Sequence, residues 1–226
     1  MRIALISDIH GNYQALEAVL GSEEFNSTEE AYCLGDLVGY YPYPEECVTR
    51  IKQERIVCVM GNHDYSCVEN KPCYDNETGR LSLEITRKLV SLRTIDFLSK
   101  LPRKLEIELN NKRLYLVHGS PANLLNGYIN PQDDVEVPAG FDLLATGHTH
   151  IQFSRRIASK LIVNPGSVGQ PRDGIKGACL AVLDLEETSV SLTRVNYDAS
   201  EVITRTAGLK CYEAADSLRQ LFEGSS

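Results

Sequence analysis

Residues 2–10 read Arg-Ile-Ala-Leu-Ile-Ser-Asp-Ile-His, a short apolar run that ends in an acid and an imidazole. Apolar runs of this length that end at turn residues are typical of buried strands. Four more runs end just before polar residues that stand beside glycine: residues 31–34 before Asp36, residues 55–60 before Asn62 and His63, residues 114–117 before His118, and residues 143–146 before His148 and His150. Sites in open α/β sheets form beyond the carboxyl ends of strands, so we expect these five tips to converge.

All five histidines of the chain lie in these motifs. Neutral imidazole is the commonest metal ligand among protein side chains. The motifs also carry aspartate and asparagine but no cysteine thiolate, and such a set suits hard-to-borderline divalent ions. The sequence therefore predicts a metal centre at the strand tips.

The number of candidate ligands indicates two ions. Seven residues qualify, which is too many for one tetrahedral site and suits two ions about 3.5–4 Å apart that share a carboxylate. Asp36 is the natural bridge. In extended chain, residues two apart share a face, so we expect His148 and His150 to reach the same cavity, one for each metal. The seven are Asp8, His10, Asp36, Asn62, His118, His148 and His150.

The order of the motifs resembles that of the calcineurin-like metallophosphoesterase superfamily, in its branch of small single-domain prokaryotic phosphodiesterases and phosphatases. The resemblance runs from Asp8 to about Asn164. The motifs are Asp-x-His at residues 8–10, Gly-Asp-x-x-Gly at 35–39, Gly-Asn-His-Asp at 61–64, His-Gly at 118–119 and Gly-His-Thr-His at 147–150.

The resemblance implies a role for each residue. Asp8, His10 and His150 would hold the first metal, Asn62, His118 and His148 the second, and Asp36 would bridge them. A hydroxide shared by the two metals would attack the phosphorus in line, without a covalent phosphoenzyme. His63 would be catalytic rather than a ligand, because in the family it protonates the leaving oxygen or steadies charge on the phosphoryl group.

Two departures from the family's protein phosphatases disfavour that activity. Gly39 stands where those enzymes carry the aspartate that orients the catalytic histidine, and Asp64 replaces their glutamate. The segment 164–172 resembles the small prokaryotic enzymes instead. A binding scaffold of the same fold is a further alternative, although the retromer scaffold subunit has lost ligands that this sequence keeps.

We therefore expect a dinuclear metal-dependent phosphoesterase that hydrolyses a small phosphate ester, with a phosphodiester favoured over a monoester. The ligand set accepts Mn, Fe, Co, Ni or Zn, among which we favour manganese. The motifs do not name the substrate, because loops select everything beyond the phosphate. Arg172 either clamps a substrate phosphate or is a solvated loop charge.

Composition limits the partners. With 226 residues we expect one metallophosphoesterase domain over residues 1–226. A net charge of −8 disfavours binding to duplex nucleic acid, which needs Lys and Arg against phosphates. No apolar run reaches the ~18 residues of a membrane span.

The seven cysteines form no Cys-x-x-Cys motif, which favours a reducing, cytoplasmic setting. Cys67 and Cys73 either pair, bind metal or remain unpaired thiols, and we favour the last.

The pattern along the chain predicts an α/β (α+β) fold, with strand–helix units followed by hairpins. Two mixed sheets should pack face to face with helices outside, which agrees with the four-layer αββα sandwich that the resemblance implies. We expect helices at residues 13–20, 45–54, 81–92, 95–101 and 212–222, and hairpins at 105–117, 152–163 and 178–197.

Three loop segments stand near the motifs. We expect residues 65–79 to form a polar loop. Residues 121–138 either cover the substrate, with Tyr128 or Asn126 on the leaving group, or form a solvated crossover. The tyrosines of residues 40–44 either stack on a base or aryl ester or, as we favour, pack their loop against the next helix.

Overall fold

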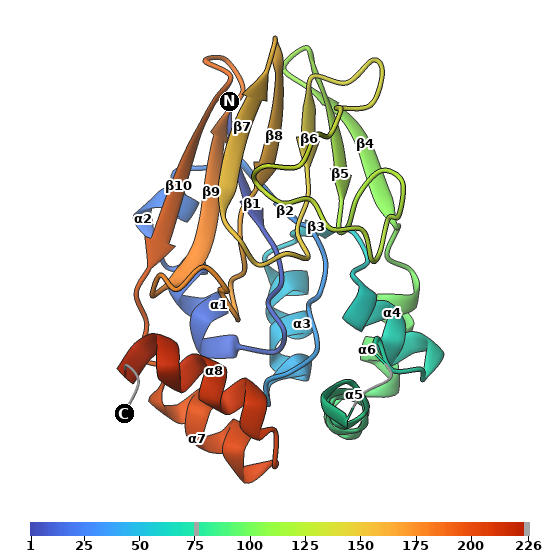
Figure 1. Ribbon diagram of the computed structural model, residues 1–226, viewed down its shortest axis with the longest axis vertical. Coiled ribbons are helices and arrows are strands. Elements are labelled where there is room, and N and C mark those ends of the chain that lie inside the picture. The colour runs from blue at the N-terminus through green and yellow to red at the C-terminus, as the bar shows by residue number, and fades with distance from the viewer. Residues whose placement is uncertain (75–76, 224–226) are drawn as a thin grey trace.

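Two five-stranded mixed sheets pack face to face, with helices around and below them (Figure 1). The computed structural model describes residues 1–74 and 77–223. The first sheet has the strand order β10-β9-β1-β2-β3. The three strands β1, β2 and β3 are parallel, while β9 pairs antiparallel with both β1 and β10. These strands are β1 (Arg2–Ile6), β2 (Glu30–Cys33), β3 (Val57–Cys58), β9 (Ala178–Asp184) and β10 (Ser189–Val195).

The second sheet has the order β4-β5-β6-β8-β7. Its three central strands β5, β6 and β8 are parallel, and the outer strands β4 and β7 pair antiparallel with β5 and β8. All three predicted hairpins are present, as β4–β5, β7–β8 and β9–β10. The strands are β4 (Lys104–Leu109), β5 (Lys112–Val117), β6 (Leu143–Ala145), β7 (Phe153–Ile157) and β8 (Lys160–Asn164).

Strand β1 shows how the layers are held. Its side chains alternate between two clusters, because successive strand residues point to opposite faces of a sheet. Ile3 and Leu5 pack in the core between the sheets, and Ala4 and Ile6 pack in the core beneath the helices. All four are completely buried, so β1 is a central strand with no solvent face. The predicted two-sheet sandwich with flanking helices is confirmed.

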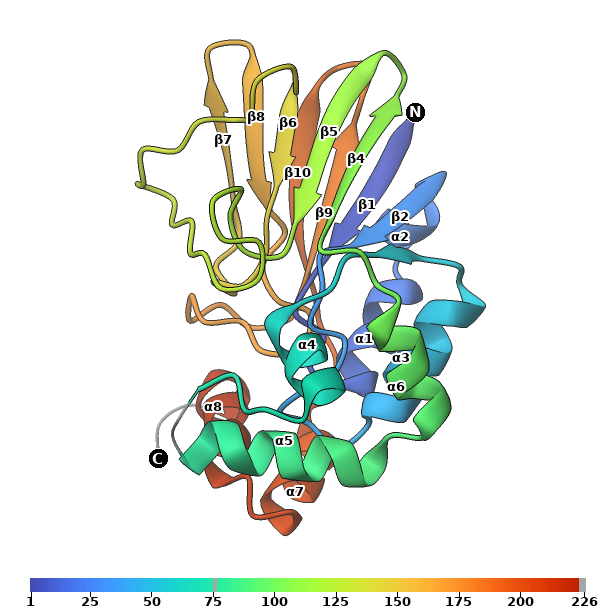
Figure 2. The ribbon, with the colours of Figure 1, turned by 90° about the vertical axis from the view of Figure 1, so that its right-hand side faces the viewer.

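The helices are α1 (Tyr13–Leu20), α2 (Glu23–Asn26), α3 (Pro44–Gln53), α4 (Asn62–Glu69), α5 (Glu77–Leu89), α6 (Leu92–Ser99), α7 (Ser200–Gly208) and α8 (Tyr212–Glu223). Helices α1, α3 and α6 cover the outer face of the first sheet. Helices α5, α7 and α8 pack together at the end of the sheets (Figure 2) through Ile85, Val202 and Leu218. On the outer face of the second sheet, the irregular segment 119–142 contributes Ile129, Val137 and Phe141.

The prediction of a polar loop over residues 65–79 is wrong at both ends. Helix α4 runs through Glu69 and α5 begins at Glu77, while residues 75 and 76 lie outside the described residues. Helix α4 begins at Gly61 as its N-cap, and the carboxylate of Asp64 accepts a hydrogen bond from the Gly61 N–H at 3.0 Å. Gly61 and Asn62 therefore begin a helix that directly follows β3. The short helices α2 and α7 were not predicted either.

The two loop cysteines are unpaired thiols, as favoured. Cys67 is buried within α4, and Cys73 is half-buried after it. The Cys73 thiol donates to the carbonyl oxygen of Asn62 at 3.3 Å. No helix among residues 1–74 and 77–223 is long and apolar enough to cross a membrane.

Candidate metal centre

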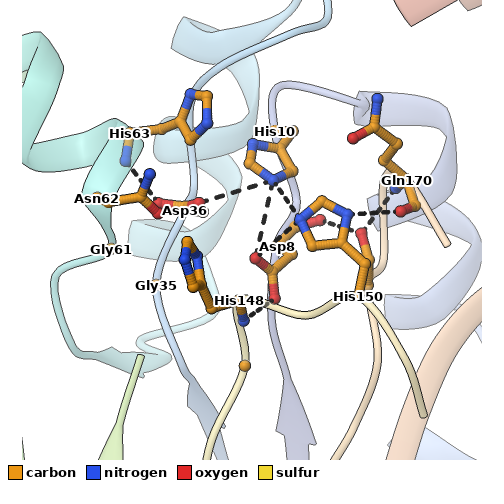
Figure 3. A network of polar contacts seen from close by, with 12 residues as sticks. Asp8, His10, Gly35, Asp36, Gly61, Asn62, His63, His148, His150 and Gln170 are labelled. Atoms are coloured by element: carbon orange, nitrogen blue, oxygen red, sulfur yellow. Dashed lines mark hydrogen bonds and ion pairs between the residues drawn. The ribbon is translucent and has the colours of Figure 1, made fainter. Parts of the chain in front are cut away.

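The strand tips bring all eight predicted site residues together. Each is at most 7% exposed. Asp8 and His10 follow β1, Asp36 follows β2, His118 follows β5, and His148 and His150 follow β6. Asn62 and His63 form the first turn of α4. Figure 3 shows that the labelled side chains among them lie close together and come from separate segments of the chain.

The backbone at five of these residues lies in the left-handed region. The φ angles are +54° at Asp8, +52° at His10, +55° at Asp36, +65° at His148 and +60° at His150. Residues other than glycine rarely adopt this conformation, and such strain gathers at functional sites. The expectation that His148 and His150 lie in extended chain is therefore wrong. The two imidazoles nevertheless reach two different clusters, because each residue turns the chain.

The first cluster consists of Asp8, His10 and His150, whose ligand atoms all lie within 4.8 Å of one another. The Nε2 atoms of His10 and His150 are 3.1 Å apart. Asp8 Oδ1 lies 3.3 Å from His150 Nε2 and 3.7 Å from His10 Nε2. The other oxygen, Asp8 Oδ2, accepts a hydrogen bond of 3.1 Å from the His148 N–H, so Oδ1 is left facing the imidazoles.

The second cluster consists of Asp36, His118 and His148. His118 Nε2 lies 3.1 Å from His148 Nδ1 and 3.3 Å from Asp36 Oδ2. It also lies 3.0 Å from Asn62 Oδ1, which adds a fourth ligand atom to the cluster. The seven candidate ligands thus form two groups that meet at Asp36, the grouping that the family resemblance implies.

Asp36 lies between the clusters. Its Oδ1 accepts a hydrogen bond of 2.8 Å from the His63 N–H at the start of α4. This fixes the carboxylate so that Oδ2 lies 3.3 Å from His118 Nε2 in one cluster and 3.7 Å from His10 Nε2 in the other. Both Asp36 Oδ2 and Asp8 Oδ1 are buried without a hydrogen-bond partner among the described residues. Buried carboxylate oxygens of this kind need a cation.

The histidine tautomers point to the same conclusion. Nδ1 of each of three ligand histidines faces a backbone carbonyl oxygen: His10 faces Val38, His118 faces Leu34 and His150 faces Gln170. A carbonyl oxygen only accepts, so in the neutral imidazole the ring proton is on Nδ1 and the Nε2 lone pair faces the cluster. The lone pairs of His10 and His150 then oppose each other at 3.1 Å, an arrangement that a shared cation makes favourable. The residues fit two divalent ions.

Burial and the neighbouring charges set the protonation of the site. Burial lowers the pKa of His63 to about 4 and the pKa of His148 to about 4, so both imidazoles are neutral at pH 7. Burial also disfavours a charged His118, but the Asp36 carboxylate outweighs it and raises the pKa of His118 to about 9. Burial works against an ionised Asp36, yet His118 and His63 hold its pKa well below the usual value.

His63 lies at the rim of the centre, beside the ring of His10, with ring centroids 4.8 Å apart. Its ring nitrogen also lies close enough to His10 and Asp36 to form a third potential metal-binding group. Gly39 is packed against both imidazoles: a Cβ there would lie 2.6 Å from His10 Nδ1 and 3.1 Å from His63 Nδ1. The position that carries an aspartate in the family's protein phosphatases therefore has no room for a side chain here.

Arg172 lies near the centre but is exposed. Its Nη2 donates to Gln170 Oε1 at 2.8 Å. Burial raises the pKa of Tyr40 to about 12, against the opposing effect of Arg172, which hydrogen-bonds the Tyr40 hydroxyl. Arg172 forms no ion pair with any acid within residues 1–74 and 77–223. Its charge is therefore available to a ligand.

The sequence reasoning missed the role of Asp64, which it noted only as a difference from the protein phosphatases. The buried Asp64 carboxylate accepts hydrogen bonds from four backbone N–H groups, of Asp36, Leu37, Val38 and Gly61, at 2.8 to 3.2 Å. It thereby ties the loop that carries Asp36 to the start of α4. The only indication of this role in the sequence was that Asp64 directly follows Asn62 and His63.

Comparison with known proteins agrees with this arrangement. The family model of the calcineurin-like phosphoesterase superfamily domain matches residues 1–188. An uncharacterized protein of Methanocaldococcus jannaschii is 34% identical over 213 residues, which cover 87% of this chain and 88% of that protein. The phosphodiesterase YfcE of Escherichia coli is 27% identical over 205 residues, covering 84% of this chain and 91% of YfcE.

A solved structure shows the same similarity. The metallophosphoesterase from Sphaerobacter thermophilus has a TM-score of 0.81 and 29% identity, and the match covers 98% of this chain and 99% of that chain. The similarity therefore extends over the strands and loops that carry all eight site residues.

Proposed function

The chain belongs to the calcineurin-like phosphoesterase superfamily, and we propose that it hydrolyses small phosphate esters, phosphodiesters ahead of monoesters, with two divalent metal ions. The observation that carries the proposal is the pair of clusters that meet at Asp36, with buried carboxylate oxygens and imidazole lone pairs all directed inward. A hydrolase that used a protein side chain as the nucleophile would not need seven metal-ligand residues grouped around two metal positions.

Each cluster would hold one ion. Asp8, His10 and His150 would hold the first ion, and Asn62, His118 and His148 would hold the second. Asp36 would contribute to both. When bound, the ions would offset the negative charge of the phosphate and activate water as the nucleophile. The ligand set suits Mn, Fe, Co, Ni or Zn, with manganese our first choice.

His63 would be the catalytic acid. Its backbone N–H donates to Asp36, and its ring packs beside His10 and Tyr40. Burial lowers the pKa of this imidazole to about 4, but the negative charge of a bound phosphate would raise it. The imidazolium would then donate a proton to the leaving oxygen as the phosphorus–oxygen bond breaks. This general acid contribution is typically about 10²–10⁴-fold in rate.

Arg172 would bind the phosphate oxygens that face away from the two ions. A planar guanidinium donates two parallel hydrogen bonds to a phosphate. The absence of an acidic partner for Arg172 within the described residues supports this role.

We also propose that the whole chain acts as one domain, although the family match ends at residue 188. The C-terminal helices α7 and α8 pack against α5 and the buried Tyr41. The Tyr41 hydroxyl donates to the carbonyl oxygen of Ala214 at 3.4 Å.

Hydrolysis of bis(p-nitrophenyl) phosphate and p-nitrophenyl phosphate tests the activity. The protein is stripped of metal and then supplied with Mn²⁺. We expect turnover that needs the metal, that is faster on the diester, and that falls by about 10²–10⁴-fold in His63→Ala. Metal-independent turnover, or a fully active His63→Ala variant, would contradict the proposal. The ratio of the two rates separates diester from monoester preference.

A further inference from the structure

A cavity of about 350 Å³ lies against the candidate metal centre. Small-molecule sites usually measure about 300–1,000 Å³, so this cavity has room for part of a metabolite. The residues used below are Tyr40, Tyr74, Tyr128, Gln170, Arg172 and Glu213, which all line it. The proposed function does not assign the three tyrosines or Glu213.

The cavity lies next to the metal centre, because the rings of its three tyrosines pack near site histidines. The ring centroid of Tyr40 lies 4.8 Å from that of His10 and 4.7 Å from that of His63. The Tyr128 ring lies 4.3 Å from the His148 ring, and the Tyr74 ring lies 6.4 Å from the His63 ring. A group joined to a phosphate at the centre would therefore enter between these rings.

Two distant loops form one side of the cavity. Tyr74 follows α4, and Tyr128 lies in the irregular segment 119–142. Their hydroxyl oxygens are 3.1 Å apart and share a hydrogen bond. Tyr128 is 50% exposed although its ring packs against His148. An exposed ring held in place at a site offers a stacking surface for a flat group.

Part of the cavity wall comes from outside the family match. Glu213 lies in α8, beyond residue 188 where the family match ends. It accepts a hydrogen bond from Thr78 at the start of α5, so α5 and α8 are joined at the cavity wall. The polar edges of the cavity are thus the Glu213 carboxylate and the Gln170 amide, beside the Arg172 guanidinium proposed for the phosphate. A simple phenyl group would leave these edges unused, whereas a nucleobase offers both a flat face and hydrogen-bonding edges.

We propose that this cavity binds the base of a nucleoside phosphate ester, stacked on Tyr128 and Tyr74, while the phosphate lies at the metal centre. The proposal rests on the proposed function for the position of the phosphate. It goes beyond that function by naming the substrate class and the residues that select it. Base–aromatic stacking changes binding by about tenfold or more for each ring.

Calorimetric titration tests the proposal with adenosine 5′-monophosphate and ribose 5-phosphate, which share the phosphate and sugar and differ only in the base. The protein is the Mn²⁺-loaded His63→Ala variant, which keeps all seven candidate ligands and suppresses turnover. We expect the nucleotide to bind at least about tenfold more tightly than ribose 5-phosphate. Equal affinities would overturn the proposal.

Variants in the same background identify the cavity. Tyr128→Ala should reduce the preference for the nucleotide to within about threefold, and Tyr128→Phe, which keeps the ring, should retain it. Tyr13→Ala is the matched control, because Tyr13 is a half-buried tyrosine that lines a different cavity. A preference that survives both Tyr128→Ala and Tyr74→Ala would place the base elsewhere and overturn the proposal.

The two proposals fail in different ways. If bis(p-nitrophenyl) phosphate is not hydrolysed but the nucleotide preference depends on Tyr128, the proposed function fails and the cavity assignment stands. If hydrolysis proceeds and ribose 5-phosphate binds as tightly as the nucleotide, the cavity assignment fails alone.

Discussion

Asp64 Oδ2 accepts a hydrogen bond of 2.8 Å from the backbone N–H of Asp36, the residue that lies between the two ligand clusters. Three further backbone N–H groups donate to the same carboxylate. Asp64 therefore does not contact the candidate ions, but it fixes the loop that presents the Asp36 carboxylate. Residues that orient metal ligands from behind contribute to metal affinity as well as to the fold.

Replacing Asp64 by asparagine should weaken metal binding. The amide NH₂ group would face backbone donors, and the loop that carries Asp36 would lose part of its support. We expect Mn²⁺ affinity and turnover to fall by about 10–100-fold, the usual effect of such supporting groups. Titration of metal-stripped protein with Mn²⁺ measures the affinity. Asp64→Glu, which keeps the carboxylate, is the control; an Asp64→Asn variant with unchanged metal affinity would show that the contact is structural only.

Asp36→Asn should remove the group that both clusters share. Because the amide carries no charge and its NH₂ group cannot replace Oδ2 as a ligand, we expect the metal content to fall from near two ions per chain to one or fewer, with turnover lost by orders of magnitude. Elemental analysis of protein dialysed against Mn²⁺ gives the count. Two tightly held ions in the variant would rule out Asp36 as the bridge.

The packing at Gly39 predicts a steric effect. In Gly39→Ala the new methyl group would collide with His10 and His63. We expect a loss of about 1–3 kcal/mol in the free energy of unfolding together with lower turnover. Gly174→Ala separates the collision from backbone strain, because Gly174 also has a positive φ, +75°, but no atom within 4 Å of the added Cβ. If both variants lose activity equally, the packing of Gly39 on the histidines is not the cause.

Metal removal should destabilise the protein. Without cations, the buried Asp8 and Asp36 oxygens and the opposed imidazole lone pairs are uncompensated. An ion at 1,000 times its Kd stabilises the folded state by about 4 kcal/mol. We therefore expect the Tm to rise with Mn²⁺ concentration and to fall on chelation. The increase in Tm with Mn²⁺ should be much smaller in Asp36→Asn. If Mn²⁺ does not change the Tm of the parent protein, the ligand assignment is contradicted.

The site residues could be predicted because each motif is local. A strand, a turn and a polar residue are adjacent in the sequence, so His118 or the pair His148 and His150 could be assigned to a strand tip without knowing the rest of the fold. The division of the ligands into two groups came from the family resemblance alone.

The remaining features depend on contacts that the sequence does not show. Helix α4 was missed because its first turn is polar and is stabilised by contacts with the Asp36 loop. The left-handed backbone at His148 and His150 is imposed by the surroundings. The cavity joins Tyr74 and Tyr128, which are 54 residues apart. Neither hydrophobic periodicity nor the turn-forming residues indicate which distant residues come into contact.

The presence of two ions at Asp36 is the central claim, and the most direct measurement is a crystal structure of the Mn²⁺-soaked protein with anomalous scattering from manganese. We predict two anomalous peaks about 3.5–4 Å apart, one among Asp8, His10 and His150 and the other among Asn62, His118 and His148, with Asp36 between them. A single peak, or none at saturating Mn²⁺, would contradict the two-metal account.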